Sequence, residues 1–438
     1  MKISIFGLGY VGSVSLGCLA RDGHQVIGVD VDQTKLDIIQ KGLSPIIEEG
    51  MEELMSNAAK SGRVEVTSDT HAAISNSELS FVCVGTPSRA NGSQDLAAVQ
   101  KVSEQIGAAL KEKDGFHTVV IRSTVVPGTV ETLVYEGLEG SSGKQAGKDF
   151  GVCFQPEFLR EGSSIKDYDH PPFTVVGGDS ERSLQALQSL FGHLPGEFIT
   201  TSIRSAEMLK TCCNVFHALK ITFTNEVGRI CQSLEVDSNE VMDLICQDRQ
   251  LNISTAYMRP GFAFGGSCLP KDLRALMHIA KSHDVDVPML SGVLPSNQLH
   301  IDHAFDMVMS SGKRSIGMIG LSFKSGTDDL RESPLVTLAE KLIGKGMDLK
   351  IYDPEVNVAR LIGANRRYIE ETIPHIASLM QENCADVVKN SDVVIVGLGD
   401  KSIMHEIPDL LRENHLTIDL VGMPERETLK GEYRGACW

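Results

Sequence analysis

The residues best suited to covalent chemistry lie in one glycine-rich stretch, Gly261-Phe-Ala-Phe-Gly-Gly-Ser-Cys-Leu-Pro-Lys-Asp272. The glycines and the proline at 270 predict a loop that turns into a helix, with the proline in the first turn. Cys268 would then lie at a helix N-terminus beside Lys271, and both features favour the nucleophilic thiolate. Asp272, one turn further on, could hydrogen-bond to the same reacting centre. We therefore predict that Cys268 is a nucleophile and not a buried structural thiol.

A second stretch could bind a dinucleotide. Gly7-Leu-Gly-Tyr-Val-Gly12 follows an apolar strand and leads into a helical pattern. Gly7 permits a tight turn, Gly9 lets the backbone approach a pyrophosphate, and Gly12 allows close helix packing. Asp30 ends the next predicted strand, where a carboxylate accepts hydrogen bonds from ribose hydroxyls and repels a 2′-phosphate. NAD is therefore favoured over NADP, with FAD or a glycine-rich turn without cofactor as the alternatives.

A thiolate beside a dinucleotide fold indicates a particular oxidation. Converting an alcohol to an aldehyde needs only a base and a hydride acceptor. Continuing to an acid needs a tetrahedral carbon that can release a second hydride. A thiolate that adds to the aldehyde creates this centre and leaves a thioester, which water hydrolyses. Cys268 together with the glycine motif thus predicts that two NAD are reduced for each substrate molecule.

Such a reaction also needs oxyanion stabilisers and a base for water. Lys210 and Asn214, one turn apart on a long predicted helix, offer a cation and an amide donor, unless they form a solvated helical face. Glu157 and Glu161 follow a predicted strand, and one of them could activate water, with Thr124. The alternative is that both are ordinary acids at a helix N-terminus. We find no metal-ligand spacing and predict no metal site.

These residues must be positioned by an α/β framework. Short apolar strands alternate with amphipathic helices through the first two hundred residues and again from Ser315, which predicts parallel, doubly wound sheets. Between them, Ser202 to Glu235 reads as one helix without proline, with Lys210, Asn214, His217 and Asn225 along one face. We predict two Rossmann-like domains joined by a long central helix. The predicted domains are 1–201 for NAD, 202–300 for dimerisation and the catalytic cysteine, and 301–438 for a ligand other than a second dinucleotide.

Composition limits the possible partners and compartment. A 42% hydrophobic and 23% charged chain of 438 residues can bury two or three cores. The net charge of −17 argues against nucleic acid and anionic membranes as partners. The chain has no run of 18 apolar residues, and its N-terminal residues read as a strand and a turn. The ten cysteines form no C-x-x-C pair, so we expect reduced thiols and a cytoplasmic protein.

The motifs together resemble the nucleotide-sugar 6-dehydrogenase family, which includes UDP-glucose and GDP-mannose dehydrogenases. They occur in the family's order and span nearly the whole chain. After the first glycine motif come Val84-Gly-Thr-Pro87, Ser123–Thr129, Gln155–Glu161, Lys-x-x-x-Asn from position 210, the stretch around Cys268, and Phe323–Pro334. The resemblance is strongest to members that act on GDP-mannose. It implies oxidation of GDP-mannose to GDP-mannuronate for alginate synthesis, in a homodimer or larger homo-oligomer, with the sugar nucleotide bound by residues 301–438.

The resemblance also implies residue roles beyond the nucleophile. The residues expected to contact NAD are Tyr10, Val11, Asp30, Lys35, Thr86, Thr124, Lys271 and Arg331. Those expected to contact the sugar nucleotide are Glu161, Lys210, Asn214, His217, Asn225, Tyr257, Arg259, Phe262, Gly265 and Lys324.

The sequence departs from the family pattern at two positions, and two alternative dehydrogenase classes remain. Ala256 replaces one tyrosine of a pair, which removes an aromatic contact, and Gln155 stands where asparagine is common. A UDP-glucose 6-dehydrogenase would use the same catalytic residues. A 3-hydroxyacid-type dehydrogenase also carries Lys-x-x-x-Asn but stops after one hydride and needs no cysteine.

Overall fold

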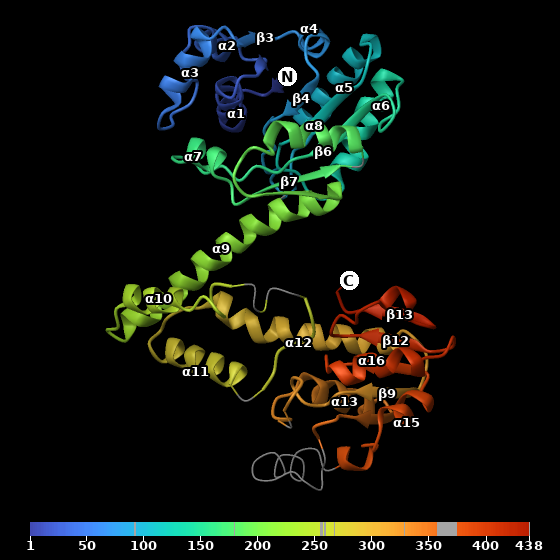
Figure 1. The fold of residues 1–438 in the computed structure, drawn as a ribbon. Helices are drawn as coiled ribbons and strands as arrows, with labels where there is room; N and C mark the ends of the chain where they lie inside the picture. The colour runs from blue at the N-terminus through green and yellow to red at the C-terminus, as the bar shows by residue number, and fades with distance from the viewer. Residues whose placement is uncertain are drawn as a thin grey trace. The chain divides into compact units, whose positions relative to one another are not determined.

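The computed structural model describes residues 1–91, 93–178, 180–254, 257, 260–266, 268–327, 329–356 and 375–437. The chain divides into two compact units, Met1–Ala218 (unit 1) and Leu219–Trp438 (unit 2), which are described separately below. Figure 1 shows the α/β character of each unit. Within the described ranges no helix is both long and apolar enough to cross a bilayer.

Unit 1 is built on a sheet of eight strands in the order β3-β2-β1-β4-β5-β6-β7-β8. The reversal of order beside β1 is the doubly wound topology, which places ligand sites at the carboxyl ends of the strands. The strands are β1 (Lys2–Phe6), β2 (Gln25–Val29), β3 (Val64–Thr67), β4 (Leu79–Val82), β5 (His117–Ile121), β6 (Phe150–Phe154), β7 (Phe173–Gly178) and β8 (Glu197–Thr201).

One strand pair departs from the expected parallel arrangement. Strand β7 pairs antiparallel with β6 through Cys153–Gly178 and Phe154–Gly177, whereas all other neighbours in unit 1 run parallel. The reason lies in the connection, since residues 155–172 leave the carboxyl end of β6 and re-enter the sheet from that same end. They contain only one short helix, α7 (Ser164–Asp169), and no crossover to the opposite edge.

Successive side chains of each strand point to opposite faces of this sheet. Both faces are apolar, so helices pack on both. On β4, Phe81 belongs to one buried cluster and Val82 to another. The helices of unit 1 are α1 (Tyr10–Arg21), α2 (Gln33–Gln40), α3 (Met51–Lys60), α4 (Thr70–Ser75), α5 (Ala97–Glu112), the π-helical η1 (Val130–Val134), α6 (Tyr135–Ser142), α7, α8 (Glu181–Phe191) and the start of α9 (Ile203–Ser233).

Helix α9 has 31 residues, which confirms the long helix predicted from Ser202 to Glu235. Its first half belongs to unit 1 and its second half to unit 2. Three further helices follow it in unit 2, namely α10 (Ser238–Gln247), α11 (Leu269–Ser282) and α12 (Pro288–Met309).

The rest of unit 2 is built on a second sheet, whose five strands all run parallel in the order β10-β9-β11-β12-β13. The predicted α/β fold with a parallel-sheet domain at each end and a long connecting helix is thereby confirmed. The three-domain division stays a prediction. The elements are β9 (Ser315–Ile319), α13 (Pro334–Gly344), β10 (Asp348–Tyr352), η2 (Ile376–Ser378), α15 (Cys384–Lys389), β11 (Val393–Val396), α16 (Lys401–Leu410), β12 (Leu416–Asp419), η3 (Arg426–Thr428) and β13 (Glu432–Gly435).

Candidate active site

The glycine motif has the geometry that a bound pyrophosphate needs. Gly7 has φ of +93°, a conformation that side chains rarely adopt. A Cβ on Gly12 would lie 1.9 Å from the carbonyl oxygen of Gly7, so only glycine lets α1 pack on the turn. A Cβ on Gly9 would meet open space instead, which leaves room for a ligand beside the helix N-terminus.

Asp30 follows β2 and faces this turn. Its Oδ2 accepts a hydrogen bond from the Leu8 amide at 2.7 Å, its Oδ1 accepts one from the Asp32 amide at 2.9 Å, and Lys35 Nζ lies 3.5 Å away. These contacts hold the carboxylate beside a pocket of about 230 Å³. The residues around it fit the pyrophosphate and ribose of NAD. The pocket is lined by Phe6, Gly7, Gly9, Val29, Asp30, Val31, Lys35, Ser68, Thr70, Cys83, Val84, Gly85, Val102 and Gln105.

The corresponding acid of unit 2 makes similar backbone contacts. Asp353 follows β10, and its Oδ2 accepts hydrogen bonds from the amides of Leu321 and Ser322 and from the Ser322 hydroxyl at 2.8–3.0 Å. Asp353 is also buried, with 4% of its surface exposed. The carboxylate holds the turn after β9, as Asp30 holds the turn after β1.

Two of the predicted motif loops meet in unit 1. The Thr86 hydroxyl donates to the Thr124 carbonyl oxygen at 2.7 Å, and the Ser123 hydroxyl donates to the Val84 carbonyl oxygen at 2.6 Å. These bonds join the ends of neighbouring strands β4 and β5. Thr86 and Thr124, both predicted to contact NAD, are thus brought together at the carboxyl edge of the sheet.

Lys210 and Glu157 form a buried ion pair. Lys210 Nζ lies 3.0 Å from Glu157 Oε1 and donates to the Glu157 carbonyl oxygen at 2.5 Å. The two side chains are only 9% and 10% exposed. Lys210 Nζ also lies 5.3 Å from the ring centroid of Phe158. Because the pair is largely shielded from water, its charges interact strongly with each other and with any bound group.

A pocket of about 460 Å³ opens beside this pair and collects several predicted residues. Glu157, Lys210, Asn214 and His217 all line it, whereas Glu161 is exposed and is not among its described lining residues. The lining is otherwise largely apolar or aromatic. It consists of Arg122, Gln155, Pro156, Glu157, Phe158, Leu159, Arg160, Asp167, Tyr168, His170, Pro171, Pro172, Phe173, Thr174, Phe191, Leu194, Lys210, Cys213, Asn214 and His217.

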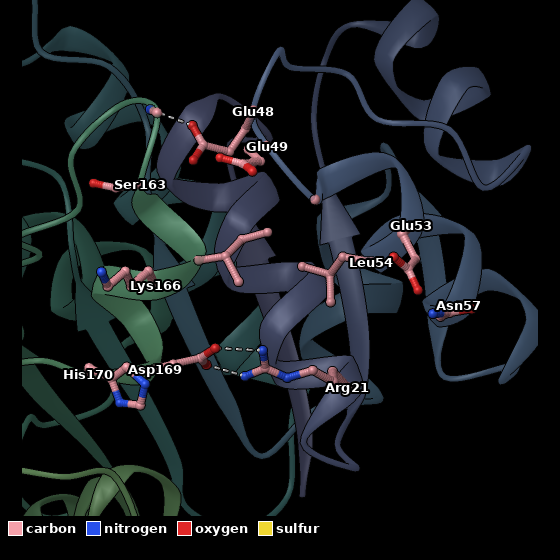
Figure 2. A pocket seen from close by; sticks show the side chains of 13 residues that line it. Arg21, Glu48, Glu49, Glu53, Leu54, Asn57, Ser163, Lys166, Asp169 and His170 are labelled. Atoms are coloured by element: carbon pink, nitrogen blue, oxygen red, sulfur yellow. Dashed lines mark hydrogen bonds and ion pairs between the residues drawn. The ribbon is translucent and has the colours of Figure 1, made fainter.

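Glu161 lies on a loop that is anchored by Glu48, a residue that the sequence motifs did not indicate. Glu48 accepts hydrogen bonds from the amides of Gly162 at 2.7 Å and Ser164 at 2.9 Å, and also from the Tyr10 hydroxyl. Burial raises the pKa of Glu48, but the hydrogen bonds outweigh it and hold that pKa below its usual value. Figure 2 shows Glu48 at the rim of a separate pocket, which the bidentate Arg21–Asp169 pair closes at its other end.

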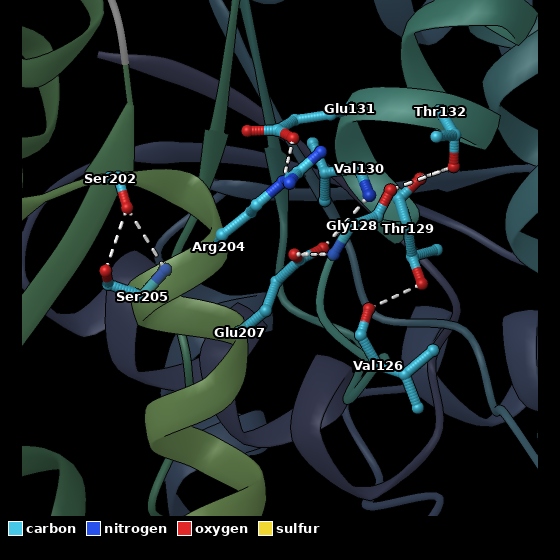
Figure 3. Close-up of polar contacts among 10 residues, drawn as sticks. All are labelled: Val126, Gly128, Thr129, Val130, Glu131, Thr132, Ser202, Arg204, Ser205 and Glu207. Atoms are coloured by element: carbon cyan, nitrogen blue, oxygen red, sulfur yellow. Dashed lines mark hydrogen bonds and ion pairs between the residues drawn. The ribbon is translucent and has the colours of Figure 1, made fainter. Parts of the chain in front are cut away.

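Glu207 is a second residue that the motifs did not indicate. It is fully buried on α9, and its carboxylate accepts hydrogen bonds from the amides of Gly128 at 2.6 Å and Val130 at 2.9 Å (Figure 3). It thereby caps the helix that begins at Val130 and ties the loop of Thr124 to α9. Burial raises the pKa of Glu207, and the two backbone hydrogen bonds act in the opposite direction.

In unit 2, Cys268 occupies the N-cap position of α11. The Asp272 amide donates to the Cys268 carbonyl oxygen at 2.9 Å, and Pro270 lies in the first turn, so the predicted loop-to-helix transition is confirmed. Cys268 is exposed. Lys271 Nζ bonds to Asp272 Oδ1 at 2.6 Å, and this hydrogen bond raises the pKa of Lys271. The cation expected beside the thiol is therefore shared with a carboxylate.

The loop that leads to Cys268 is held from two sides. The Asn297 amide accepts from the Phe264 N–H at 2.9 Å and donates to the Phe264 carbonyl at 2.8 Å, while His300 Nε2 bonds to the Gly261 carbonyl at 2.6 Å. On the other side, a Cβ on Gly265 would lie 2.3 Å from the Glu332 carbonyl oxygen. Gly265 is therefore explained by packing between two motif loops of unit 2.

The remaining predicted residues of unit 2 are dispersed. Arg331 forms two hydrogen bonds with the Asp329 carboxylate at 2.8 and 2.6 Å. Tyr257 is 86% exposed with φ of +61°. Phe262 contacts the His300 ring, whereas Lys324 and Asn225 are exposed. Arg259 and Ala256 lie outside the described residues.

Comparison with known protein families decides the class of this chain. Three sequence profiles of the UDP-glucose/GDP-mannose dehydrogenase family match it in order: the NAD binding domain over residues 1–195, the central domain over 204–299 and the UDP binding domain over 317–425. The chain belongs to this family. The expected cofactor, NAD, and the expected class, an NAD-dependent nucleotide-sugar dehydrogenase, are thereby confirmed.

Individual relatives match over the full length. The chain is 51% identical to GDP-mannose 6-dehydrogenase of Pseudomonas aeruginosa and 52% identical to that of Pseudomonas syringae pv. tomato, covering 100% of each chain. It is 33% identical to a UDP-glucose 6-dehydrogenase of Haloferax volcanii over 90% of both chains. The crystal structure of a ternary complex of the Pseudomonas aeruginosa GDP-mannose dehydrogenase matches with a TM-score of 0.97, at 50% identity and full coverage of both chains.

Proposed function

We propose that the chain oxidises the C6 alcohol of GDP-mannose to GDP-mannuronate with two NAD per turnover. The observation that carries this proposal is the identity of about half of all residues with GDP-mannose 6-dehydrogenases along the whole chain, against a third with a UDP-glucose enzyme. The product would supply the precursor of alginate.

The reaction balances as two hydride removals and one hydrolysis. First, the C6 alcohol loses a proton and a hydride and becomes an aldehyde. The Cys268 thiolate then forms a bond from sulfur to C6 while the aldehyde oxygen takes up a proton, and the resulting thiohemiacetal loses that proton and a second hydride to give a thioester. Water attacks C6, the carbon–sulfur bond breaks, and the thiolate leaves as the carboxylate forms. When bound, NAD accepts one hydride in each oxidation.

The residues of unit 1 would bind NAD and stabilise charge at C6. The glycine turn with Tyr10, Val11, Asp30 and Lys35 would hold the dinucleotide. Lys210 and Asn214, which line one pocket, would stabilise the C6 oxyanion, with His217 as a further substrate contact.

The base that activates water would be Glu157 or Glu161, with Thr124. The buried contact of Glu157 with Lys210 supports the first choice, whereas the exposure of Glu161 supports direct access to substrate and water.

The residues of unit 2 would supply the nucleophile and further contacts. The helix N-terminus at Cys268 favours its thiolate, and Asp272 on the same turn would hydrogen-bond at the reacting centre. Lys271 and Arg331 would contact NAD. The proposed sugar-nucleotide contacts of this unit are Asn225, Tyr257, Arg259, Phe262, Gly265 and Lys324.

A stoichiometric assay tests the proposal. Purified enzyme is given limiting GDP-mannose or limiting UDP-glucose with excess NAD, and NADH is followed by absorbance. We expect two NADH for each GDP-mannose and little turnover of UDP-glucose. Preferential oxidation of UDP-glucose would make the chain a UDP-glucose 6-dehydrogenase, and one NADH with free aldehyde would place it in the single-oxidation class.

We also propose a cytosolic homo-oligomer, at least a dimer. Helix α9 exposes a series of large apolar side chains, which is unusual for a solvated helix and supports burial against a second copy. These are Met208, Val215, Phe216, Leu219, Ile221 and Phe223. Light scattering coupled to size-exclusion chromatography measures the mass, and a monomer at micromolar concentration would contradict the proposal.

A further inference from the structure

One buried cation lines the pocket of about 460 Å³ beside the Lys210–Glu157 pair and lacks a hydrogen-bond partner at two of its nitrogens. Arg122 directly follows β5 and is 5% exposed. Within the described part of the chain, its Nε and Nη1 have no hydrogen-bond partner. The guanidinium carbon lies 5.7 and 5.9 Å from the ring centroids of Phe81 and Phe191. A guanidinium with two nitrogens shielded from solvent and no acceptor for either is unfavourable, so its presence indicates a function.

The other Lys and Arg side chains of this pocket are already paired. Lys210 lies 3.0 Å from the Glu157 carboxylate, and Arg160 lies 2.6 Å from that of Asp167. No ion pair joins Arg122 to a carboxylate among the described residues that line the pocket. Arg122 therefore supplies the uncompensated positive charge of this cavity.

The position of Arg122 is where a doubly wound sheet binds ligands. Val82, Ile121 and Phe154 are register partners on β4, β5 and β6, so the residues after them, Cys83, Arg122 and Gln155, follow side by side at the carboxyl edge.

Two neighbours of Arg122 show that this edge is polar and charged. Gln155 Oε1 is buried there without a partner among the described residues. Burial raises the pKa of the Cys83 thiol to about 12, while the charge of Arg122 lowers it and that of Glu157 raises it. The charges of Arg122 and Glu157 therefore both act on the Cys83 thiol.

We propose that Arg122 stabilises the negative charge that arises on the C6 oxygens of the sugar and persists in the uronate carboxylate. The inference rests on the proposed function, because only oxidation at C6 creates an anion at that end of the substrate. The carboxylate is preferred over the diphosphate because Lys210 and Asn214, the proposed oxyanion stabilisers, line the same pocket. In an enclosure rich in aromatic and apolar side chains the field of the guanidinium is weakly screened. Gln155 would accept a hydrogen bond from a sugar hydroxyl.

The test compares two ligands that differ at C6, a carboxylate against an alcohol, with a third that lacks the sugar. Dissociation constants for GDP-mannuronate, GDP-mannose and GDP are measured by calorimetry for the wild type, Arg122→Met and Arg122→Lys. Methionine keeps the unbranched stem that packs on Phe81 and Phe191 but removes the charge, whereas lysine keeps the charge. Arg182→Met is the matched control, because Arg182 also stacks on a ring, that of Phe116 at 4.4 Å, but is exposed.

We expect Arg122→Met to weaken GDP-mannuronate binding about tenfold or more, with GDP-mannose and GDP within about threefold of the wild type. Arg122→Lys should recover most of the loss, and Arg182→Met should change nothing. Equal weakening of all three ligands, or unchanged binding of GDP-mannuronate, would overturn the inference. Weakening of GDP alongside the uronate would assign the charge to the diphosphate instead. If the wild type binds neither sugar nucleotide, the proposed function itself fails.

A stability measurement separates this role from a structural one. Because Arg122→Met removes an uncompensated buried charge, its melting temperature should equal or exceed that of the wild type while its affinity for the uronate falls. A lower melting temperature, with affinity lost for every ligand, would make Arg122 a packing residue. Should Arg122→Met not fold, Arg122→Gln provides a second neutral variant for the same comparison.

Discussion

Glu207 and Lys210 stand one helical turn apart on α9, and each holds a different motif loop of unit 1. Glu207 accepts the amides of Gly128 and Val130, whereas Lys210 binds both the carboxylate and the carbonyl oxygen of Glu157. A single turn of helix thus sets the position of the loop of Thr124 against the loop of Glu157. Both residues position a loop, but only Lys210 is also proposed to stabilise charge at C6, which leads to different predictions for them.

Replacing Glu207 should mainly reduce stability. Glu207→Ala leaves the buried amides of Gly128 and Val130 without acceptors, which we expect to lower the free energy of unfolding by about 2–3 kcal/mol. Urea denaturation at pH 7 measures the change. Glu131→Ala is the matched control, since Glu131 pairs with Arg204 at the surface of the same cluster (Figure 3) and should contribute less than about 1 kcal/mol. Equal effects of the two variants would contradict the capping role.

Replacing Lys210 should mainly reduce turnover. Lys210→Met removes the proposed oxyanion cation, and we expect kcat to fall by roughly 10²–10³-fold. It also leaves the buried Glu157 carboxylate without its paired cation, so the protein should become less stable. Adding Glu157→Gln should restore stability but not turnover. NADH production and urea denaturation distinguish the two effects, and recovery of turnover in the double variant would refute the electrostatic role of Lys210.

Removing the Cys268 thiol should abolish acid formation without affecting NAD binding. In Cys268→Ala no sulfur is available to capture the aldehyde, so uronate production should fall by roughly 10³-fold or more. The dissociation constant for NADH, measured by fluorescence, should stay unchanged because the glycine turn lies in unit 1. Cys246→Ala, which removes another exposed thiol of unit 2, is the control. Normal uronate yield from Cys268→Ala would rule out the covalent mechanism.

Acid should destabilise unit 1 through a buried histidine. His117 is fully buried, and burial lowers its pKa from 6.5 to about 3. The unfolded chain therefore takes up a proton near pH 6.5 that the native protein does not bind until about pH 3, so stability falls as pH falls through this window. We expect a contribution of about 1.4 kcal/mol per pH unit from this one group.

Urea denaturation between pH 7 and 5 measures the slope of the unfolding free energy against pH. His117→Gln should flatten it, although the variant loses the 2.7 Å bond to Ser80 and starts from lower stability. His71→Gln, at an exposed site, should leave the slope as it is. An unchanged slope in His117→Gln would show that other groups govern the acid transition.

Three strands with a weak sequence signal share one position in the fold. Strands β3, β8 and β13 are all edge strands, and their sequences, VEVT, EFITT and EYRG, mix polar with apolar residues. An edge strand pairs on one side only and is partly exposed, so it needs fewer apolar residues and has a weaker signal. An inner strand such as β11, with the sequence VVIV, is buried on both faces and has a continuous apolar signal.

Features set by near neighbours in the chain were determined by the sequence alone. These include the turn of Gly7, Gly9 and Gly12, the acid at Asp30, the length of α9, and Cys268 at the start of a helix with Pro270. Contacts between segments far apart in the chain were decided only by the tertiary structure. Glu207 reaches across more than seventy residues to Gly128, and the environment of Arg122 depends on rings from β4 and α8. Local patterns fix backbone conformation, whereas burial and charge balance depend on which distant residues pack around a side chain.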